Sequence, residues 1–481
     1  MKTILQKISS FTLCIILVCS IVPVQTYASH EIPGHWQVQT DSSTTGIVKT
    51  LDYSYARNTY FSLRDIAMVL QNTSKSFSVS ITKNAVSLTL NNSYTPVGTE
   101  NTPWETTESP NLSLRRNEFT VNGQKVSYYT LMMSLPSGDY DCFMMAADFA
   151  MILDVDVSVP TAGSLQINTQ LPFHVSPAAL EESGYFYGVN SVLVGNATTG
   201  ELYYQYQSDA SYPIASTSKL MTYLLVMDAV SAGQISLEQE AIVSDAVQAL
   251  SASDDGVIPF EAGQQIPVQD LLLGALLPSS NECALCLAET VAGSEETFVQ
   301  RMNQKALDLG LSQTFFYNCH GLPSYTEDSI PAKRQNRMSA EDMFRLVSYL
   351  LKVYPQITDI TSLENATLQS LNLEVRNTNP LLHNLPEVTG LKTGTTNKAG
   401  ACLVTSLTAD DGIITHDLVV IVLGTEDSIE RGRVSGLLAR YALQAFHTGI
   451  ETSESEAIPG NLPTHAEAAV DWILQTAKKI E

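Results

Sequence analysis

The segment IASTSKLMTYLL, from Ile214 to Leu225, carries the pattern from which the fold can be inferred. It places Ser216 and Lys219 three residues apart at the start of an apolar run, on one face of a predicted helix. Leu224 and Met227 continue on that side, which predicts a central, buried helix. A serine hydroxyl is a weak nucleophile that needs an adjacent base. A lysine can be that base when its amine is neutral, and burial and the positive end of a helix both favour the neutral form.

A second cluster follows in LLLGALLPSSNECALCLAE, which places Ser279 and Asn281 between two apolar helical segments. These two residues predict a hydroxyl and an amide at the wall of a cleft. A structural alternative exists for each cluster so far. Ser216 could cap its helix while Lys219 points to solvent, and Ser279 with Glu282 fits a capping box.

The third cluster is VTGLKTGTTNKAGACLV, in which Lys392, Thr393 and Gly394 come just before a strand that we expect to begin at Ala401. Lys392 and Thr393 offer a cation and a hydroxyl to a carboxylate. Gly394 allows a ligand to approach the backbone closely. The structural alternative is a glycine turn with a solvated lysine.

The order S-x-x-K, S-x-N, K-T-G is the signature of serine β-lactamases and penicillin-binding proteins. The chain from about Gly188 to Phe446 resembles the low-molecular-mass D-alanyl-D-alanine carboxypeptidases in particular. The likeness includes ATTGELYY before the first motif, FYNCHGL at 316–322, and Ala399-Gly400 after the third. The resemblance implies a secreted serine-type carboxypeptidase that trims peptidoglycan stem peptides, is acylated by penicillin and needs no metal or cofactor.

The resemblance also assigns roles to individual residues. Ser216 attacks the D-Ala-D-Ala carbonyl and Lys219 takes its proton, while Ser279 relays protons and Asn281 holds the peptide. Lys392 and Thr393 of the third motif bind the terminal carboxylate. The backbone amides of Ser216 and Thr395 form the oxyanion hole, and Gly394 belongs to the same binding strand. Family members often add an arginine near the carboxylate; Arg431 and Arg433 are candidates, but ERGRVSG aligns loosely and neither is assigned.

Two alternatives to the carboxypeptidase stay open. A class A-like β-lactamase is disfavoured because those enzymes carry Glu in E-x-x-L-N, whereas this chain has Leu368 there and Glu364 one turn earlier. A non-catalytic wall-binding or β-lactam-sensing module is disfavoured because it would not need to keep a nucleophile with its base. Release of D-alanine from a peptide distinguishes these alternatives from the leading hypothesis.

The chain has 481 residues, which predicts two domains of mixed α/β (α+β) class. The catalytic domain is expected at 184–450, with strands at both ends and helices between them. That order predicts an antiparallel sheet covered by helices, of the β-lactamase/transpeptidase-like type. A linker is expected from Pro172 to Ser183.

Residues 30–173 predict a small, strand-rich α+β domain outside the chemistry. Two helical segments, YFSLRDIAMVL (60–70) and FMMAADFAMIL (143–153), align without gaps and indicate two related halves. The segment from about 53 to 168 resembles the N-terminal domain of copper amine oxidase type. It holds no His/Cys cluster, so no metal site is expected there. Residues 97–110 are expected to form a loop.

Both ends of the chain carry signals of location. Lys2, Lys7, an apolar run and Ala28 predict a signal peptide over 1–28, and therefore a place in the cell wall or at the outer face of the cytoplasmic membrane. Residues 451–481 are a polar tail with an amphipathic helix, whose apolar stripe packs on protein more often than on a membrane. The net charge of −24 argues against nucleic acid as a partner.

Cysteines remain scattered after the predicted cleavage and do not form a disulfide framework. Cys283 and Cys286 make a C-x-x-C within the second cluster. A redox pair needs an exposed, low-pKa thiol at a helix N-terminus. We expect two small apolar side chains on a buried helix instead.

Overall fold

The computed structural model describes most of the chain between Glu31 and Thr448. The predicted signal peptide and the predicted C-terminal tail lie outside the described residues, as does most of the predicted loop at 97–110. The described residues are 31–448 without 42–44, 54–57, 103–111, 116–117, 127–129, 135–137, 162, 183–184, 187, 324–333 and 384.

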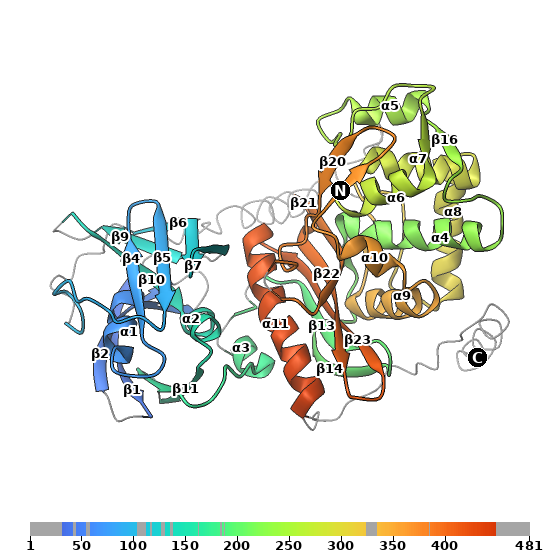
Figure 1. The fold of residues 1–481 in the computed structure, drawn as a ribbon. Coiled ribbons are helices and arrows are strands. Elements are labelled where there is room, and N and C mark those ends of the chain that lie inside the picture. The colour runs from blue at the N-terminus through green and yellow to red at the C-terminus, as the bar shows by residue number, and fades with distance from the viewer. Residues whose placement is uncertain are drawn as a thin grey trace, which may run out of the picture.

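The N-terminal unit is built from two sheets (Figure 1, blue to teal). The larger has the strand order β11-β12-β1-β2-β3-β10-β9-β6, and the smaller has the order β4-β5-β7-β8. The larger sheet consists of β1 (Glu31–Thr40), β2 (Thr45–Tyr53), β3 (Asn58–Ser62), β6 (Leu112–Arg115), β9 (Thr130–Ser134), β10 (Tyr140–Met145), β11 (Asp156–Thr161) and β12 (Ser164–Asn168). The smaller sheet consists of β4 (Phe77–Ile81), β5 (Ala85–Leu90), β7 (Glu118–Val121) and β8 (Gln124–Val126).

The two segments expected as helices are each a strand followed by a shorter helix. The first gives β3 and then α1 (Leu63–Leu70), and the second gives β10 and then α2 (Ala146–Leu153). The expected helical starts at 60 and 143 are therefore three residues too early in both. The physical reason in the first segment is a cap, because the Ser62 hydroxyl accepts a hydrogen bond from the Asp65 amide. β3 and β10 pair antiparallel, with Phe143 opposite Ser62, so the two equivalent segments lie side by side.

The segment expected to be a plain linker contains a short helix, α3 (Pro177–Glu182). Buried aromatic and apolar side chains flank this helix, namely Val175, Tyr185 and Phe186. They belong to an apolar cluster that includes side chains of the N-terminal sheet and of the C-terminal unit. The segment therefore packs between the two units.

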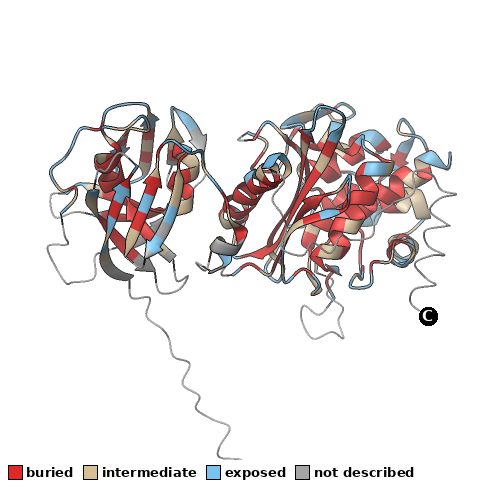
Figure 2. Cartoon of the chain, turned by 90° about the horizontal axis from the view of Figure 1, so that it is seen from below, coloured by how far each residue is buried: buried red, intermediate tan, exposed pale blue. Residues whose placement is uncertain are grey.

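The C-terminal unit is organised around a five-stranded antiparallel sheet with the order β14-β13-β23-β22-β21. Its first two strands precede the helices of residues 219–361 and its other three strands follow them, as expected, and the helix α11 (Ser428–Thr448) closes the unit. The strands are β13 (Ser191–Asn196), β14 (Glu201–Tyr206), β21 (Val388–Thr396), β22 (Gly400–Asp410) and β23 (Thr415–Thr425). Figure 2 shows buried residues along this sheet and on the helices at both of its faces.

Helices cover both faces of the sheet. α11 packs on β22 and β23 at one face, and α9 packs on β13 and β23 at the other. The long helices of this unit are α4 (Lys219–Ser231), α6 (Val268–Leu276), α7 (Asn281–Ala292), α8 (Glu295–Asp308), α9 (Ala340–Val353) and α11 (Ser428–Thr448). The shorter elements are η1 (Ala215–Ser218), α5 (Asp245–Ser251), α10 (Ile357–Thr361), β15 (Tyr212–Pro213), β16 (Glu240–Ile242), β17 (Gln265–Pro267), β18 (Arg337–Met338), β19 (Asn365–Leu368) and β20 (Leu373–Arg376).

Helix α4 is the buried centre of the helical layer, as its sequence predicts. It contacts α6, α7, α8 and α9. Ten of its thirteen residues are buried, including Tyr223, Leu224 and Met227, so the helix is apolar on nearly every side. This burial places the residues at its N-terminus, and with them Lys219, inside the protein.

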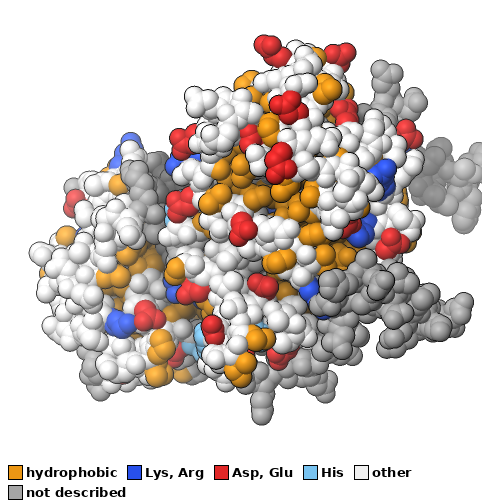
Figure 3. Space-filling view, turned by 45° about the vertical axis from the view of Figure 1, so that its right-hand side comes forward, with side chains coloured by type: hydrophobic (Ala, Val, Ile, Leu, Met, Phe, Trp, Pro, Cys, Tyr) orange, Lys and Arg blue, Asp and Glu red, His pale blue; other side chains and the backbone are white. Residues whose placement is uncertain are grey.

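The surface is acidic, in agreement with the net charge. Figure 3 shows Asp and Glu side chains distributed over one face, with fewer Lys and Arg and no large basic patch on that face. Among the described residues, no helix is both long and apolar enough to span a bilayer.

Candidate active site

The Ser216 side chain lies on a tight turn. Ser216 belongs to the 3₁₀ helix η1, and α4 begins directly afterwards at Lys219 without a side-chain cap. The two hydroxyls that follow Ser216 stabilise the turn: Thr217 donates to the Ile214 carbonyl and Ser218 to the Ala215 carbonyl, both at 2.7 Å. The capping alternative for Ser216 is therefore wrong. Its hydroxyl faces the lysine instead.

Lys219 is buried, with 1% of its surface exposed, so the solvent-facing alternative is also wrong. Its Nζ lies 3.0 Å from the Ser216 hydroxyl, 2.8 Å from Asn281 Oδ1 and 3.5 Å from the Ser279 hydroxyl. It also donates to the His320 carbonyl at 2.9 Å. Burial lowers the pKa of Lys219 to about 7, since a charged amine is costly to bury.

The second motif meets the first one in space. Asn281 is the first residue of α7, and Ser280 caps that helix by accepting from the Cys283 amide at 3.0 Å. The predicted capping box, with Ser279 as the N-cap, is therefore wrong, because the N-cap is the next residue, Ser280. Ser279 itself has φ of 69°, a left-handed conformation that non-glycine residues seldom adopt. Strain of this kind is common at functional sites, and here it accompanies a hydroxyl directed at Lys219.

The third motif lies within the edge strand β21, just before β22, which begins at Gly400, one residue earlier than expected. Lys392 and Thr393 are buried, and Lys392 Nζ donates to the Thr393 carbonyl at 3.1 Å. Burial, with Lys219 and Arg431 nearby, holds the pKa of Lys392 well below its usual value. The Thr393 hydroxyl is 2.5 Å from that of Thr378. The alternative of a solvated lysine in a glycine turn is therefore wrong.

Gly394 brings the third motif against the first. A Cβ at this position would lie 2.8 Å from the Ile214 carbonyl oxygen, 2.9 Å from the Ser216 nitrogen and 3.0 Å from the Thr217 nitrogen. These are backbone atoms that cannot rotate away. Gly394 therefore allows β21 to approach the turn that carries Ser216, whereas the sequence predicted that it would allow a ligand to approach the backbone.

Arg431 is a site residue that the sequence analysis left unassigned. Its guanidinium donates to the Thr395 hydroxyl at 3.1 Å, and only 7% of its surface is exposed. Its Nε is buried without a hydrogen-bond partner. The loose alignment of ERGRVSG obscured the signal, whereas in the structure α11 begins at Ser428 and carries Arg431 in its first turn.

A loop at 317–322 closes the site behind Lys219. The Asn336 side chain accepts from the amides of Tyr317 and Asn318 and donates to the Ser218 hydroxyl at 2.9 Å, so it ties this loop to η1. His320 contributes to the site through its backbone carbonyl, which accepts the hydrogen bond from Lys219. Burial and the neighbouring Lys219 lower the pKa of its ring to about 3, so the imidazole is neutral.

The C-x-x-C pair is buried, as expected for apolar side chains of α7. Both thiols are free, and burial raises the pKa of Cys283 well above its usual value and that of Cys286 to about 12. Thiols of this kind stay protonated and unreactive.

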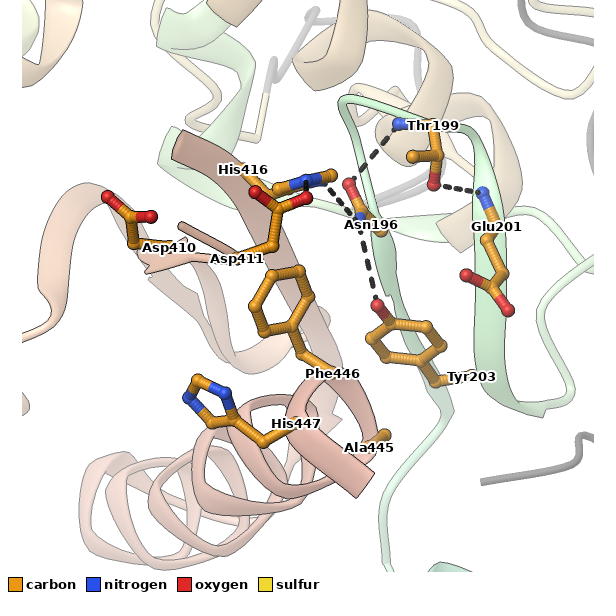
Figure 4. A pocket seen from close by; sticks show the side chains of 10 residues that line it. All are labelled: Asn196, Thr199, Glu201, Tyr203, Asp410, Asp411, His416, Ala445, Phe446 and His447. Atoms are coloured by element: carbon orange, nitrogen blue, oxygen red, sulfur yellow. Dashed lines mark hydrogen bonds and ion pairs between the residues drawn. The ribbon is translucent and has the colours of Figure 1, made fainter. Parts of the chain in front are cut away.

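A separate cavity of about 560 Å³ lies at the opposite end of the sheet, between the β22–β23 turn and the C-terminus of α11 (Figure 4). Its central polar groups are paired with one another: His416 contacts Asn196 and Asp411, each at 3.1 Å. Two amides of the turn, those of Ile413 and Ile414, donate to Asp411 and hold its pKa at about 2. The cavity contains none of the predicted site residues, and these contacts are those of a stabilised hairpin.

The site thus combines the Ser216–Lys219 pair with two buried basic side chains, Lys392 and Arg431, which we call the cationic wall. The comparisons with known proteins agree with this arrangement. Residues 187–427 match the D-alanyl-D-alanine carboxypeptidase family, and the chain belongs to this family. It is 33% identical to D-alanyl-D-alanine carboxypeptidase DacF of Bacillus subtilis over 254 residues, which are 52% of this chain and 61% of that one. It is 31% identical to DacC of Escherichia coli over 253 residues, 52% of this chain and 60% of that one. The chain thus spans about three fifths of these relatives.

Solved structures of penicillin-binding proteins also resemble the chain. One is the peptidoglycan synthesis regulatory factor PBP3 of Streptococcus pneumoniae, with a TM-score of 0.49, 30% identity, and coverage of 53% of this chain and 71% of that one. Another is the ampicillin-bound penicillin-binding protein D2 of Listeria monocytogenes, with a TM-score of 0.45, 27% identity, and coverage of 53% and 97%.

Proposed function

We propose that the protein is a serine-type D-Ala-D-Ala carboxypeptidase that removes the terminal D-alanine from peptidoglycan stem peptides. The observation that carries the proposal is the buried Lys219 amine, 3.0 Å from the Ser216 hydroxyl, with a pKa lowered to about 7. A base with a pKa near the working pH is the most effective in general base catalysis. Family membership supports the same activity.

In the first half-reaction, the Ser216 oxygen attacks the carbonyl of the penultimate D-alanine while its proton passes to Lys219. The amides of Ser216 and Thr395 are the proposed donors to the resulting oxyanion, and each such donor typically contributes about 2.7–4 kcal/mol. The bond to the terminal D-alanine then breaks. Its nitrogen takes a proton, for which Lys219 and the Ser279 hydroxyl, 3.5 Å apart, are the nearest route.

Binding of the terminal carboxylate is the proposed role of the cationic wall. Lys392 and Arg431 are both buried, and Arg431 already donates to Thr395. A guanidinium offers several N–H donors in a geometry that suits a carboxylate. Thr393 is the proposed hydroxyl donor, and Asn281 is the proposed contact to the peptide.

In the second half-reaction, water attacks the acyl-Ser216 ester and its proton passes to Lys219. The ester bond breaks, the shortened peptide leaves with a new carboxylate, and Ser216 regains its proton. No cofactor is needed for this balance. β-Lactams carry a carboxylate beside a reactive amide, so they are the proposed inhibitors, and the proposed location is outside the cytoplasmic membrane, where peptidoglycan lies.

The test is D-alanine release from a diacetyl-L-Lys-D-Ala-D-Ala peptide by the purified chain. Wild-type protein should release one D-alanine per peptide, and Ser216→Ala should release none. Ser211→Ala is the matched control, because its hydroxyl donates an exposed hydrogen bond to the Gln313 carbonyl, and this variant should behave as wild type. Equal release by wild type and Ser216→Ala would refute the assignment of the nucleophile, and no release by either would refute the activity.

A further inference from the structure

The N-terminal unit touches the catalytic unit at the helix that carries Arg431. Arg433, two residues further along α11, is buried, and its Nη1 lies 3.5 Å from Asp148 Oδ2 on α2 of the N-terminal unit. The same nitrogen lies 2.8 Å from the Met145 sulfur. In Figure 1, α2 and α11 face each other across the boundary between the two units.

Further side chains surround the contact between Asp148 and Arg433. The Tyr185 hydroxyl donates to Asp148 Oδ1 at 3.0 Å, and the Tyr185 ring lies 4.0 Å from the Arg433 guanidinium carbon. Glu430, one turn earlier on α11, accepts from Arg433 Nε at 2.9 Å. The Asp148 and Arg433 side chains are 1% and 4% exposed, so water cannot screen or replace the pairing.

We propose that Asp148, through Arg433, is a positioning residue that fixes the first turn of α11 and so places Arg431 for the substrate carboxylate. This inference rests on the proposed function for its substrate, and it gives the N-terminal unit a part in specificity. Asp148 holds Arg433 in the second turn of α11, and Arg431 reaches the third motif from the turn directly before it.

The consequence is a link between two units that are distant in sequence. The Arg433 guanidinium is paired with the buried Asp148 and with Glu430, whose side chain is 16% exposed. Among the described residues, Asp148 Oδ2 has no partner other than this ion pair. Without the Asp148 charge, Glu430 on the same helix would be the remaining anionic partner of the guanidinium, beside the Met145 sulfur and the Tyr185 ring. The start of α11 would then lose its ionic tie to the N-terminal unit, and Arg431 would lose part of its fixed direction.

The experiment compares Asp148→Asn with Asp154→Asn. The first keeps the shape and an acceptor for Tyr185 but removes the charge that faces Arg433. The second is the matched control at the C-cap of the same helix, where the side chain is 63% exposed and asparagine suits the left-handed backbone. Each variant is assayed on the D-Ala-D-Ala peptide with a free C-terminal carboxylate and on its C-terminal amide.

Asp148→Asn should raise KM for the free acid by about 2- to 30-fold with little change in kcat, and should reduce the preference for acid over amide. In an Arg431→Gln background the same change should have no further effect on that preference. Unchanged KM and preference in a folded Asp148→Asn protein, or effects that multiply in the double variant, would overturn the proposal. A loss that is equal for the acid and the amide would show a structural role only and would also overturn it.

Hydrogen exchange keeps this test independent of activity. Amides of 428–434 should exchange faster in Asp148→Asn than in Asp154→Asn or wild type, and equal exchange would overturn the proposal even if the wild type released no D-alanine. If Asp148→Asn fails to fold, Tyr185→Phe takes its place, because it removes the hydrogen bond to Asp148 and keeps the ring beside Arg433.

Discussion

The amine of Lys219 lies 3.0 Å from the hydroxyl of Ser216, in a site where only 1% of the lysine is exposed. Partners surround the amine, but none of the groups that hydrogen-bond it is a carboxylate. Its acceptors are the Asn281 amide oxygen and the His320 carbonyl, together with the serine hydroxyls. Neutral acceptors compensate a buried charge less than a carboxylate does, and for this reason the amine can lose its proton near neutral pH.

The pH profile of acylation should report the Lys219 pKa. Below about pH 7 the amine is protonated and cannot accept the serine proton, so the rate constant for acylation by benzylpenicillin should rise about tenfold per pH unit. Above about pH 8 it should level off. Stopped-flow measurements between pH 5.5 and 9.5 would show this. A rise that continues to pH 9.5 would mean that Lys219 keeps an ordinary pKa.

Replacement of Lys219 by arginine should keep the charge and remove the base, since a guanidinium does not lose its proton near neutral pH. Acylation should fall by roughly 10²–10⁴, the range attributed to general base catalysis. Intact-mass spectrometry at timed intervals measures the rate. Lys352→Arg, on the outer end of α9, is the matched control and should react as wild type. Near-normal acylation of Lys219→Arg would contradict the proposed role.

Loss of Arg431 should weaken carboxylate binding and leave the acylation chemistry. Arg431→Gln should raise KM for the D-Ala-D-Ala peptide roughly 10- to 100-fold, as expected when a hydrogen bond to a charged group worth about 1.5–3 kcal/mol is removed. The C-terminal amide of the same peptide should be affected much less. Initial rates on both substrates provide the comparison. An equal loss for the two would show that Arg431 supports the fold and not the carboxylate.

Gly394→Ala should displace the turn that carries Ser216, because its Cβ would lie within 3.0 Å of three backbone atoms of that turn. We expect a destabilisation of roughly 1–3 kcal/mol and a large loss of acylation. Gly436→Ala on α11 is the matched control: its nearest neighbour, Leu381, would be at 3.5 Å, and alanine favours a helix. Thermal unfolding and penicillin labelling test both. A fully active Gly394→Ala would contradict the tight packing.

Deacylation of the penicillin adduct should be slow. Leu368, where class A β-lactamases would place their glutamate, is buried in the apolar core on β19, and Glu364 instead pairs with His383 at 2.7 Å. Neither offers a second base at Ser216. Stopped-flow acylation followed by timed mass spectrometry should find a long-lived penicilloyl-enzyme with weak turnover. Rapid multiple turnover without an accumulated adduct would instead favour the β-lactamase alternative.

From the sequence alone we could predict the family, the order of strands and helices in the catalytic unit, and eight candidate site residues. Motifs of this kind can be recognised because acyl transfer requires a few residue types at fixed spacings. The same pattern left each local role open, since a helix cap and a nucleophile look alike when only neighbours along the chain are considered. The division of the chain at 173–184 and the signal peptide stay predictions.

Features that depend on contacts between distant segments could be seen only in the folded chain. There Lys219 is buried, Ser280 and not Ser279 caps α7, the third motif lies in an edge strand, and Arg431 contacts Thr395. Asp148 also contacts Arg433, which lies 285 positions further along the chain. The physical reason is that burial, and with it the pKa of an amine or the strength of an ion pair, depends on every element packed around a side chain, which local spacing does not encode.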